Sequence, residues 1–420
     1  MTIGLYTLTS PLHDQRALDA ASSQFLADIE RELATQEKTY ALQLKGPDFA
    51  DFGTEELSVI YVRTGGTEGL FKEIFGRVSR TPDGKVRPVR LLTSGKSNSL
   101  AASMEILSFL RQHDCPGEII HGSSGYIAER LALLADAEAA RKELCGARLG
   151  VIGAPSDWLI ASRADRAAVR EKLGIELVDI PIEELIAEIG KKSYPQSELL
   201  RTVRQHADRM PEKVKAYREG AFHVYGALKR IVEKYELRGL TLRCFDLLGT
   251  VGNTGCLALA ILNAEGIPAG CEGDVPALLT MAVSRALVGV SGFQANPSQI
   301  DPETGEMLFA HCTVPLDMLR AYSYDTHFES GIGVAIRGEL PEGDVTIFKL
   351  AGDLSRSCVA EAELLRNPCQ ADLCRTQAVL KTAGLADYFL KNPIGNHHII
   401  LPGRQRRRIE AFLAGAGCGD

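Results

Sequence analysis

The chain has 420 residues, 45% hydrophobic and 24% charged, which is enough to bury a large core and more than one ordinary domain holds. Its 47 basic and 54 acidic residues give a net charge of −7, which lacks the positive footprint of nonspecific nucleic-acid binding. The first residues show no basic stretch followed by an apolar run, and no segment approaches the roughly 20 apolar residues of a membrane span. We therefore expect a cytoplasmic protein of two or three domains that binds neither nucleic acid nor membrane.

The first part of the chain alternates short β-branched runs with longer helical runs. In chain order these are the strand LSVIYV (57–62) and a helix from Glu68, the strand PVRLLTSG (88–95) and a helix at 98–112, and the strand GEIIHG (117–122) and a helix at 126–144. Such alternation is typical of a parallel sheet covered by helices. It predicts an N-terminal α/β domain over residues 1–147.

A second α/β domain begins near Cys145–Arg148, where RLGVIGAPSDWLIAS offers a fresh strand and turn. The patterns that follow are a helical stretch (211–235), the strand LTLRCFDLL (240–248), the helix TGCLALAILNAEG (254–266), the turn IPAGCEGD (267–274) and the helix VPALLTMAVSRAL (275–287). The motifs GxGxxG and GxxxxGK[ST] are both absent, which argues against an ordinary dinucleotide or P-loop enzyme. We predict that this domain covers residues 148–290.

After about Val290 the pattern changes to short extended runs separated by Gly, Pro, Asp or Glu. The runs are SGFQAN, EMLFAHCTV, SGIGVAIRGEL, DVTIFKLAG, DLCRTQAVL and HHIILPG. Closely spaced strands without intervening helices predict an antiparallel sheet or small barrel over residues 291–420. The expected fold class is therefore α/β, with two Rossmann-like parallel-sheet domains followed by a mainly antiparallel, barrel-like C-terminal domain.

The chain contains ten cysteines without regular spacing and without a CxxC pair. This usage fits buried, reduced thiols better than a disulfide framework. Cys244, Cys256, Cys271 and Cys312 lie in the segments that carry the candidate chemistry, so a thiolate metal site is the alternative to simple apolar packing.

The candidate chemistry begins with two acidic residues in the segment GCEGDVPA, Glu272 and Asp274. The segment is a turn that leads from a strand of small residues into an apolar helix. A functional carboxylate is one reading of each residue. The alternative is a plain helix-start carboxylate, since the N-terminal end of a helix favours negative charge.

Further candidates follow in the C-terminal part. Asn296 comes after an apolar strand, and its alternative role is an Asx-type turn before Pro297. His311 ends the run EMLFAH, and His397 and His398 are consecutive at the start of another strand. Because strand alternation sends only one of two neighbours toward a given face, we expect one ligand from the pair. Carboxylate, amide and imidazole groups from separate strands would suit a divalent ion such as Mn²⁺ or Mg²⁺.

Residues 323–331 (SYDTHFESG) form an acidic, glycine-terminated segment that contains Asp325, His327 and Glu329. Loops of this kind often contact substrates, and a solvated loop is the alternative. We consider His327 a candidate partner for a sugar hydroxyl.

The stretch from LRCFDLL through TGCLALAILNAEGIPAGCEGDVPALLTM resembles the core of the L-fucose isomerase family, and NHHIILPGRQRRRIEAFLAG resembles its HisHis strand and following helix. In that family a glutamate of a CExD segment binds the metal, and Glu272 matches it. A second acidic ligand lies about two dozen residues further on, where this chain has Asn296. The related L-arabinose isomerases carry a metal-binding histidine and a late HisHis pair whose second member binds metal, which His311 and His398 match.

The resemblance implies a metal-dependent aldose–ketose isomerase that works through a cis-enediolate. The implied cofactor is one divalent ion, Mn²⁺ by preference with Mg²⁺ or Co²⁺ as alternatives, and its implied ligands are Glu272, Asn296, His311 and His398. The implied substrate is a sugar, with His327, Asn296 and His397 as its binding residues.

The implied general base is Glu272. Because the amide of Asn296 cannot shuttle a proton, Asp274 or Asp301 would have to supply the missing acid. The alternative is a non-catalytic sugar-binding or regulatory protein on the same fold, and epimerisation or an aldol-type step on the enediolate is a further reading. In the family the N-terminal domain helps close a neighbouring subunit's site, which implies a homo-oligomer with sites near subunit interfaces.

Overall fold

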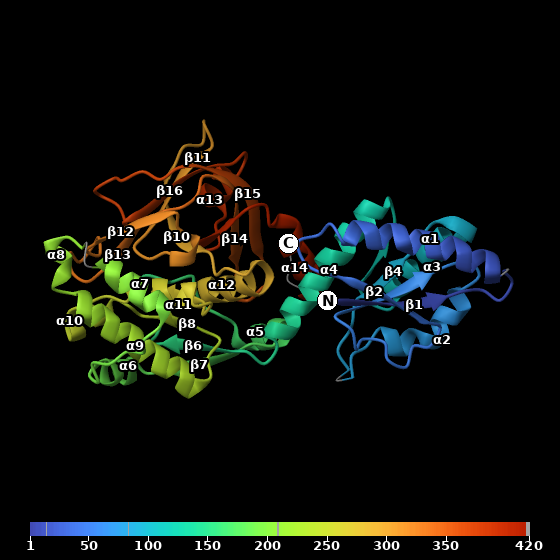
Figure 1. Cartoon of the computed structure of the whole chain (residues 1–420), viewed down its shortest axis with the longest axis horizontal. Coiled ribbons are helices and arrows are strands. Elements are labelled where there is room, and N and C mark those ends of the chain that lie inside the picture. Colours follow the sequence, from blue (N-terminus) through green and yellow to red (C-terminus); the bar gives the residue numbers. More distant parts are fainter. Residues whose placement is uncertain (14, 83, 208–209, 417–420) are drawn as a thin grey trace. The chain divides into compact units, whose positions relative to one another are not determined.

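The computed structural model describes residues 1–13, 15–82, 84–207 and 210–416. The chain divides into two compact units, Met1–Ala139 and Ala140–Asp420 (Figure 1). In the part of the chain that the structure describes, no helix has both the length and the apolar character of a membrane span.

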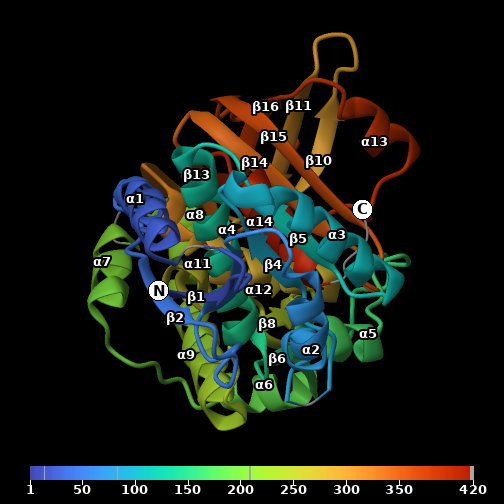
Figure 2. The same cartoon turned by 90° about the vertical axis from the view of Figure 1, so that its right-hand side faces the viewer.

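The first unit contains a five-stranded parallel sheet in the order β2-β1-β3-β4-β5 (Figure 2). Its strands are β1 (Thr2–Leu8), β2 (Ala41–Gly46), β3 (Leu57–Val62), β4 (Val89–Leu92) and β5 (Gly117–Ile120). Its helices are α1 (Gln15–Leu33), α2 (Glu68–Val78), α3 (Ser99–Gln112), the short 3₁₀ helix η1 (Lys96–Asn98) and α4 (Ser124–Leu144), which runs on into the second unit.

Both faces of this sheet are apolar because helices cover both. Ile3 and Val59 face a cluster that includes Ile29 of α1 and Leu131 of α4. The other face packs against α2 and α3 through a separate cluster, which contains Tyr6, Ile60, Phe71 and Ile106. Alternate residues of one strand thus enter different layers, as expected of a sheet buried on both sides.

The second unit begins with a four-stranded parallel sheet in the order β7-β6-β8-β9. Its strands are β6 (Arg148–Ile152), β7 (Glu176–Ile180), β8 (Gly239–Leu242) and β9 (Ala269–Cys271). The helices of this part are α5 (Arg166–Leu173), α6 (Ile182–Ile189), α7 (Glu198–Ala207), α8 (Glu212–Lys215), α9 (Arg218–Tyr235), α10 (Asp246–Val251), α11 (Cys256–Ala264) and α12 (Val275–Val288).

The rest of the second unit is built around a closed antiparallel barrel in the order β10-β11-β16-β15-β14-β17. Its strands are β10 (Phe293–Ile300), β11 (Glu306–His311), β14 (Gly343–Leu350), β15 (Ser357–Arg366), β16 (Thr376–Lys381) and β17 (His398–Pro402). The remaining elements are the strand pair β12 (Ala321–Asp325) and β13 (Ala335–Glu339), the helices α13 (Ala386–Lys391) and α14 (Arg406–Ala416), and the 3₁₀ helix η2 (Leu316–Met318). The ladder between β10 and β17 closes the barrel.

Helix α12 joins the parallel sheet to the barrel. It contacts β8 and β9 of the sheet and also β14 and β17 of the barrel, and Figure 1 shows α11 and α12 between the two. Eleven of its fourteen residues are buried, which explains why its sequence is apolar on nearly every face. The carboxyl end of β9 and the start of β17 are therefore held against the same helix.

The predicted fold class is confirmed: two parallel sheets with helices precede an antiparallel barrel. The division into domains at residues 147 and 290 stays a prediction. The predicted strand at 240–248 is shorter than expected, because β8 ends at Leu242 and Asp246 already begins α10. The predicted helical stretch at 211–235 is two helices, α8 and α9, separated at residues 216–217.

One ion cluster ties β12, β13 and α8 together around Asp325. Its carboxylate lies 2.6 Å from Lys213 Nζ, 3.0 Å from an Arg337 nitrogen and 3.7 Å from Arg375 Nε, and its side chain is 14% exposed. Burial alone would raise the pKa of Asp325, but the hydrogen bonds from Lys213 and Arg337 lower it to about 2. The buried charge of Asp325 is therefore compensated by its cationic partners.

We expect Asp325→Asn to destabilise the protein by about 2 kcal/mol near neutral pH. A depressed folded-state pKa contributes stability above the unfolded value near 4, and that contribution is lost as the pH falls toward 2. The difference in free energy of unfolding between wild type and variant, measured by urea titration, should shrink from pH 6 to pH 3. Asp387→Asn, which removes an exposed pair with Lys391, is the control; a difference independent of pH would contradict the assignment.

Candidate functional site

The site starts at a tight turn that follows β9. Glu272 and Gly273 both have positive φ, +65° and +68°, and Asp274 then caps α12. A left-handed backbone costs a non-glycine residue about 1 kcal/mol or more. The turn packs closely on the loop after β6: Ser156 N donates to the Glu272 carbonyl, and a Cβ at position 273 would lie 2.6 Å from Ala154 O. The surrounding structure thus holds Glu272 in a strained conformation.

Two histidines of the barrel converge on the Glu272 carboxylate. His311 Nε2, at the end of β11, and His397 Nε2, just before β17, each lie 3.6 Å from Glu272 Oε1. The side chains of Glu272, His311 and His397 are 11%, 6% and 0% exposed. One ligand atom from each lies within 4.8 Å of the others, so this group could hold a metal ion.

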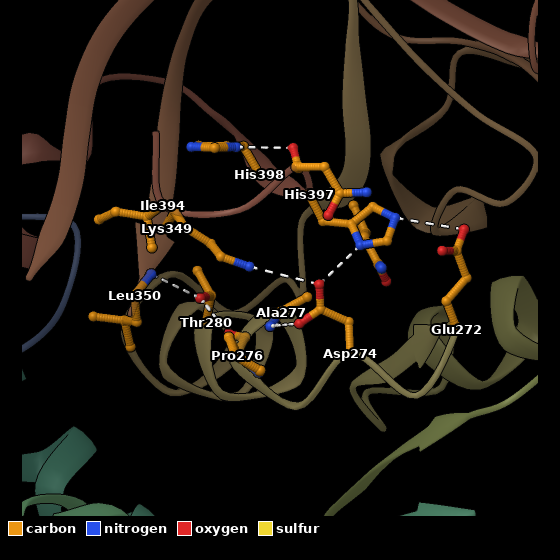
Figure 3. A network of polar contacts seen from close by, with 12 residues as sticks. Glu272, Asp274, Pro276, Ala277, Thr280, Lys349, Leu350, Ile394, His397 and His398 are labelled. Atoms are coloured by element: carbon orange, nitrogen blue, oxygen red, sulfur yellow. Dashed lines mark hydrogen bonds and ion pairs between the residues drawn. The ribbon is translucent and has the colours of Figure 1, made fainter. Parts of the chain in front are cut away.

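Asp274 holds His397 from the opposite side (Figure 3). Its Oδ2 lies 2.8 Å from His397 Nδ1, while its other oxygen accepts the backbone N–H of Ala277 at 2.8 Å. Asp274 is therefore a helix cap and an imidazole partner at once. Because it accepts at Nδ1, the neutral ring keeps its proton there and turns the Nε2 lone pair toward Glu272.

The charges of the site are strongly coupled. Burial alone would raise the pKa of Glu272, but the close approach of the His311 and His397 imidazoles, each at 3.6 Å, holds it far below its usual range. Burial would lower the pKa of His397, but Asp274 and Glu272 raise it to about 9. Burial lowers the pKa of His311. Without a metal, His397 is therefore the protonated, positively charged residue of the site, and the neighbouring Glu272 is ionised.

These residues fit a divalent cation. Among the described residues, His397 Nε2, which faces Glu272, is buried without a hydrogen-bond partner, which is costly for a polar atom. A cation between Glu272 and the two Nε2 atoms would replace the proton on His397 and supply the charge that the carboxylate requires. One carboxylate and two imidazoles are common ligands of Mn²⁺ and Zn²⁺ in proteins.

An aromatic wall extends from Glu272 toward the segment 326–332. Trp158 Nε1 donates to Glu272 Oε2 at 2.7 Å, and its ring meets Phe245 edge-on at 4.8 Å between centroids. Phe245 meets the ring of His327 in the same manner at 5.3 Å. Sequence reasoning missed Trp158, although it is the sole tryptophan of the chain and follows the first strand of the second sheet.

The structure places His398 apart from the cluster. Its Nε2 lies 2.8 Å from the Tyr388 hydroxyl, its Nδ1 donates to the Asn396 carbonyl at 3.1 Å, and its ring packs on Phe389. Burial lowers its pKa to about 3. Of the consecutive pair, it is therefore His397 that joins Glu272, whereas the sequence analysis chose His398 as the metal ligand.

Two other predicted site residues, Asn296 and Asp301, lie in different places. Asn296 lies on β10 opposite Ala310, and its Oδ1 accepts a 3.0 Å hydrogen bond from Asn396, the residue before His397. Asp301 is exposed in the loop between β10 and β11, where its carboxylate accepts the backbone N–H groups of residues 303 and 304. The carboxylate of Asp301 therefore stabilises the turn in which it lies.

The residues of the segment 323–331 have two different roles: one belongs to a structural ion cluster, and two lie near the candidate site. Asp325 belongs to the ion cluster described above. His327 is 7% exposed, and burial lowers its pKa to about 4, with His311 and Glu272 also within electrostatic reach. Burial raises the pKa of Glu329, and the charge of Glu272 raises it further. Glu329 is therefore a largely exposed carboxyl group within electrostatic reach of Glu272.

The four cysteines considered as thiolate ligands are buried. Burial raises the pKa of Cys256, and contact with Cys244 followed by burial raises that of Cys271, so neither thiol ionises readily. The possible metal-binding group found among the described residues contains no cysteine.

Comparison with known proteins finds similarity to sugar isomerases. No protein-family model matches the chain. Proteins named sulfoquinovose isomerase from Priestia aryabhattai and Priestia megaterium are 26% identical to it over 268 residues, which covers 60% of this chain and 59% of each relative. The chain is similar to sugar isomerases. A sulfoquinovose isomerase from a Clostridium species is 26% identical over 188 residues, 44% of this chain and 41% of the relative.

The chain thus spans about 59% of the length of the first two curated relatives. Their names agree with the sugar-isomerase part of the resemblance described above. Membership of the L-fucose and L-arabinose isomerases in particular stays a prediction.

Proposed function

We propose that this protein is a metal-dependent aldose–ketose isomerase. The observation that carries the proposal is the convergence of Glu272, His311 and His397, one carboxylate and two imidazoles on a single buried point. The similarity to sulfoquinovose isomerases supports the same class of reaction. As substrate we propose sulfoquinovose or a closely related aldose.

In this proposal Glu272, His311 and His397 hold one divalent ion, with Mn²⁺ preferred. When bound, the ion would polarise two adjacent sugar oxygens and stabilise the charge of an enediolate. Trp158 orients Glu272 through its indole N–H, and Asp274 orients His397.

Proton transfer needs a base and an acid in addition to the ion. Glu272 is ionised at neutral pH and is our proposed base at C2. Asn296 cannot shuttle a proton, and Asp274 is occupied with His397 and the start of α12. We propose Glu329 for this role, because it lies two residues from His327, which packs against Phe245 beside the site, and because burial and the charge of Glu272 raise its pKa. His327 would bind a sugar hydroxyl nearby.

The test is exchange of the C2 proton from a panel of aldoses and ketoses, sulfoquinovose included, in deuterated water with added Mn²⁺. We expect exchange and ketose formation with at least one sugar, and a strong loss of both in Glu329→Gln. Sugar binding without exchange would replace the proposal with the non-catalytic sugar-binding protein. Absence of both metal binding and exchange would exclude the isomerase.

Trp158 offers an optical reading of the metal site. Because its indole donates directly to Glu272, Mn²⁺ binding should quench its emission with the same midpoint as direct metal titration. In Trp158→Phe the signal should vanish while Mn²⁺ affinity falls by about tenfold or less, the worth of one hydrogen bond. If saturating Mn²⁺ leaves the emission of Trp158 unchanged, the ion does not bind next to Glu272.

A further inference from the structure

Lys349 lies on β14, within the apolar run IFKL, and is 1% exposed. In the described part of the chain its Nζ makes no hydrogen bond, and the Asp274 carboxylate lies 3.7 Å away. A buried ammonium is costly unless an opposite charge compensates it. The placement of Lys349 therefore depends on Asp274.

The same carboxylate oxygen serves both neighbours. Asp274 Oδ2 faces Lys349 Nζ at 3.7 Å and His397 Nδ1 at 2.8 Å, and Figure 3 shows both side chains directed at it. The other oxygen is bound to Ala277 N. A line of contacts thus runs from Lys349 through Asp274 and His397 to Glu272.

We propose that Lys349 is a positioning residue of the metal site. The positive charge of Lys349 attracts Asp274 Oδ2 and keeps this oxygen between Lys349 and His397. Asp274 in turn fixes the ring of His397 so that Nε2 points toward Glu272. Lys349 touches neither substrate nor ion in this arrangement. The inference rests on the proposed function, because the ring orientation matters only if a cation binds at Nε2.

A cavity of about 530 Å³ makes this role testable by chemical rescue. Lys349 lines it together with Pro276, Ser162, Gly395 and Arg356. When the lysine side chain is shortened, the cavity gives a small alkylammonium ion a route to Asp274. An added cation can replace the charge of Lys349, but it cannot replace a lost packing contact in a filled core.

The experiment compares Mn²⁺ binding in wild type, Lys349→Ala and Lys349→Met, by electron paramagnetic resonance and without substrate. Removal of residues that support metal ligands typically costs 10- to 100-fold in affinity, and we expect a loss of about that size in both variants. Ethylammonium chloride should restore affinity several-fold in Lys349→Ala but not in Lys349→Met, whose side chain fills the space. Potassium chloride at equal concentration controls for ionic strength. Lys391→Met, which removes an exposed ion pair, should bind as wild type does.

The outcomes separate the two proposals. If the wild type binds no Mn²⁺, the proposed function fails. If the wild type binds and both Lys349 variants bind equally well, the positioning role is overturned while the proposed function stands. Loss of affinity without ethylammonium rescue, in a variant whose thermal unfolding remains cooperative, also overturns it. If Lys349→Ala does not fold, the affinity of Lys349→Met decides, since its volume is close to that of lysine.

Discussion

Replacing Glu272 with Gln should abolish Mn²⁺ binding and sugar isomerisation together. The carboxylate is the only anionic member of the Glu272–His311–His397 group, so the amide leaves two imidazoles without a charged ligand. An amide is also not a base, and loss of a positioned base alone costs up to about 10⁴-fold in rate. We therefore expect a fall in kcat/KM of at least about 1,000-fold.

The matched control is Asp301→Asn, which makes the same change in charge at a residue that the sequence analysis placed among the catalytic acids. Because Asp301 is exposed and engaged with its own turn, we expect Mn²⁺ affinity and C2 proton exchange within about twofold of wild type, the effect of an ordinary surface change. Isothermal titration and the exchange assay measure both. Retained activity in Glu272→Gln, or its loss in Asp301→Asn, would reverse the assignment.

Replacing His397 or His398 with Ala should have different effects: the first should reduce Mn²⁺ binding and the second should reduce stability. His397→Ala should remove Mn²⁺ binding, with a loss of at least about 100-fold in affinity, because it deletes a ligand and leaves Asp274 without its imidazole partner. His398→Ala should instead lower the free energy of unfolding by about 2–4 kcal/mol, because it opens a cavity and strips Tyr388 of a partner.

Urea unfolding and Mn²⁺ titration of both variants decide the matter. The folded fraction of His398→Ala should bind Mn²⁺ within a few-fold of wild type. If His398→Ala loses the metal while His397→Ala retains it, then the choice made from the sequence is correct and the cluster described here is not the metal site.

Local sequence patterns predict many of the strands and helices of the fold. The alternation from Leu57 onward predicts β3 to β6 and the helices between them, because each element buries its own apolar face. The closure of the barrel is a different matter: β10 pairs with β17, about a hundred residues further on, and no local pattern specifies such a partner. The run SCVAEAELLR of β15, rich in Ala, Glu and Leu, was not among the predicted strands, because these residues favour helices when their neighbours are unknown.

The candidate site shows the same division. Glu272 and His311 stand out in the sequence because the first directly follows an apolar strand and the second ends one. Whether His397 or His398 joins them depends on where β17 begins, and a shift by one residue exchanges the faces. Trp158 lies in the loop after β6 and Lys349 lies on β14, and neither belongs to a motif. Only their contacts with Glu272 and Asp274 bring them to the site.

The pairing of β17 with β10 also has a consequence for the order of folding. The same few residues that close the barrel set His397 opposite Glu272, so closure of the barrel would also complete the proposed ligand set. An intermediate with an open barrel would have Glu272 and His311 but no third ligand. Metal uptake would therefore follow barrel closure during refolding, and a bound ion would oppose the release of both β11 and β17, the strands next to its two histidine ligands.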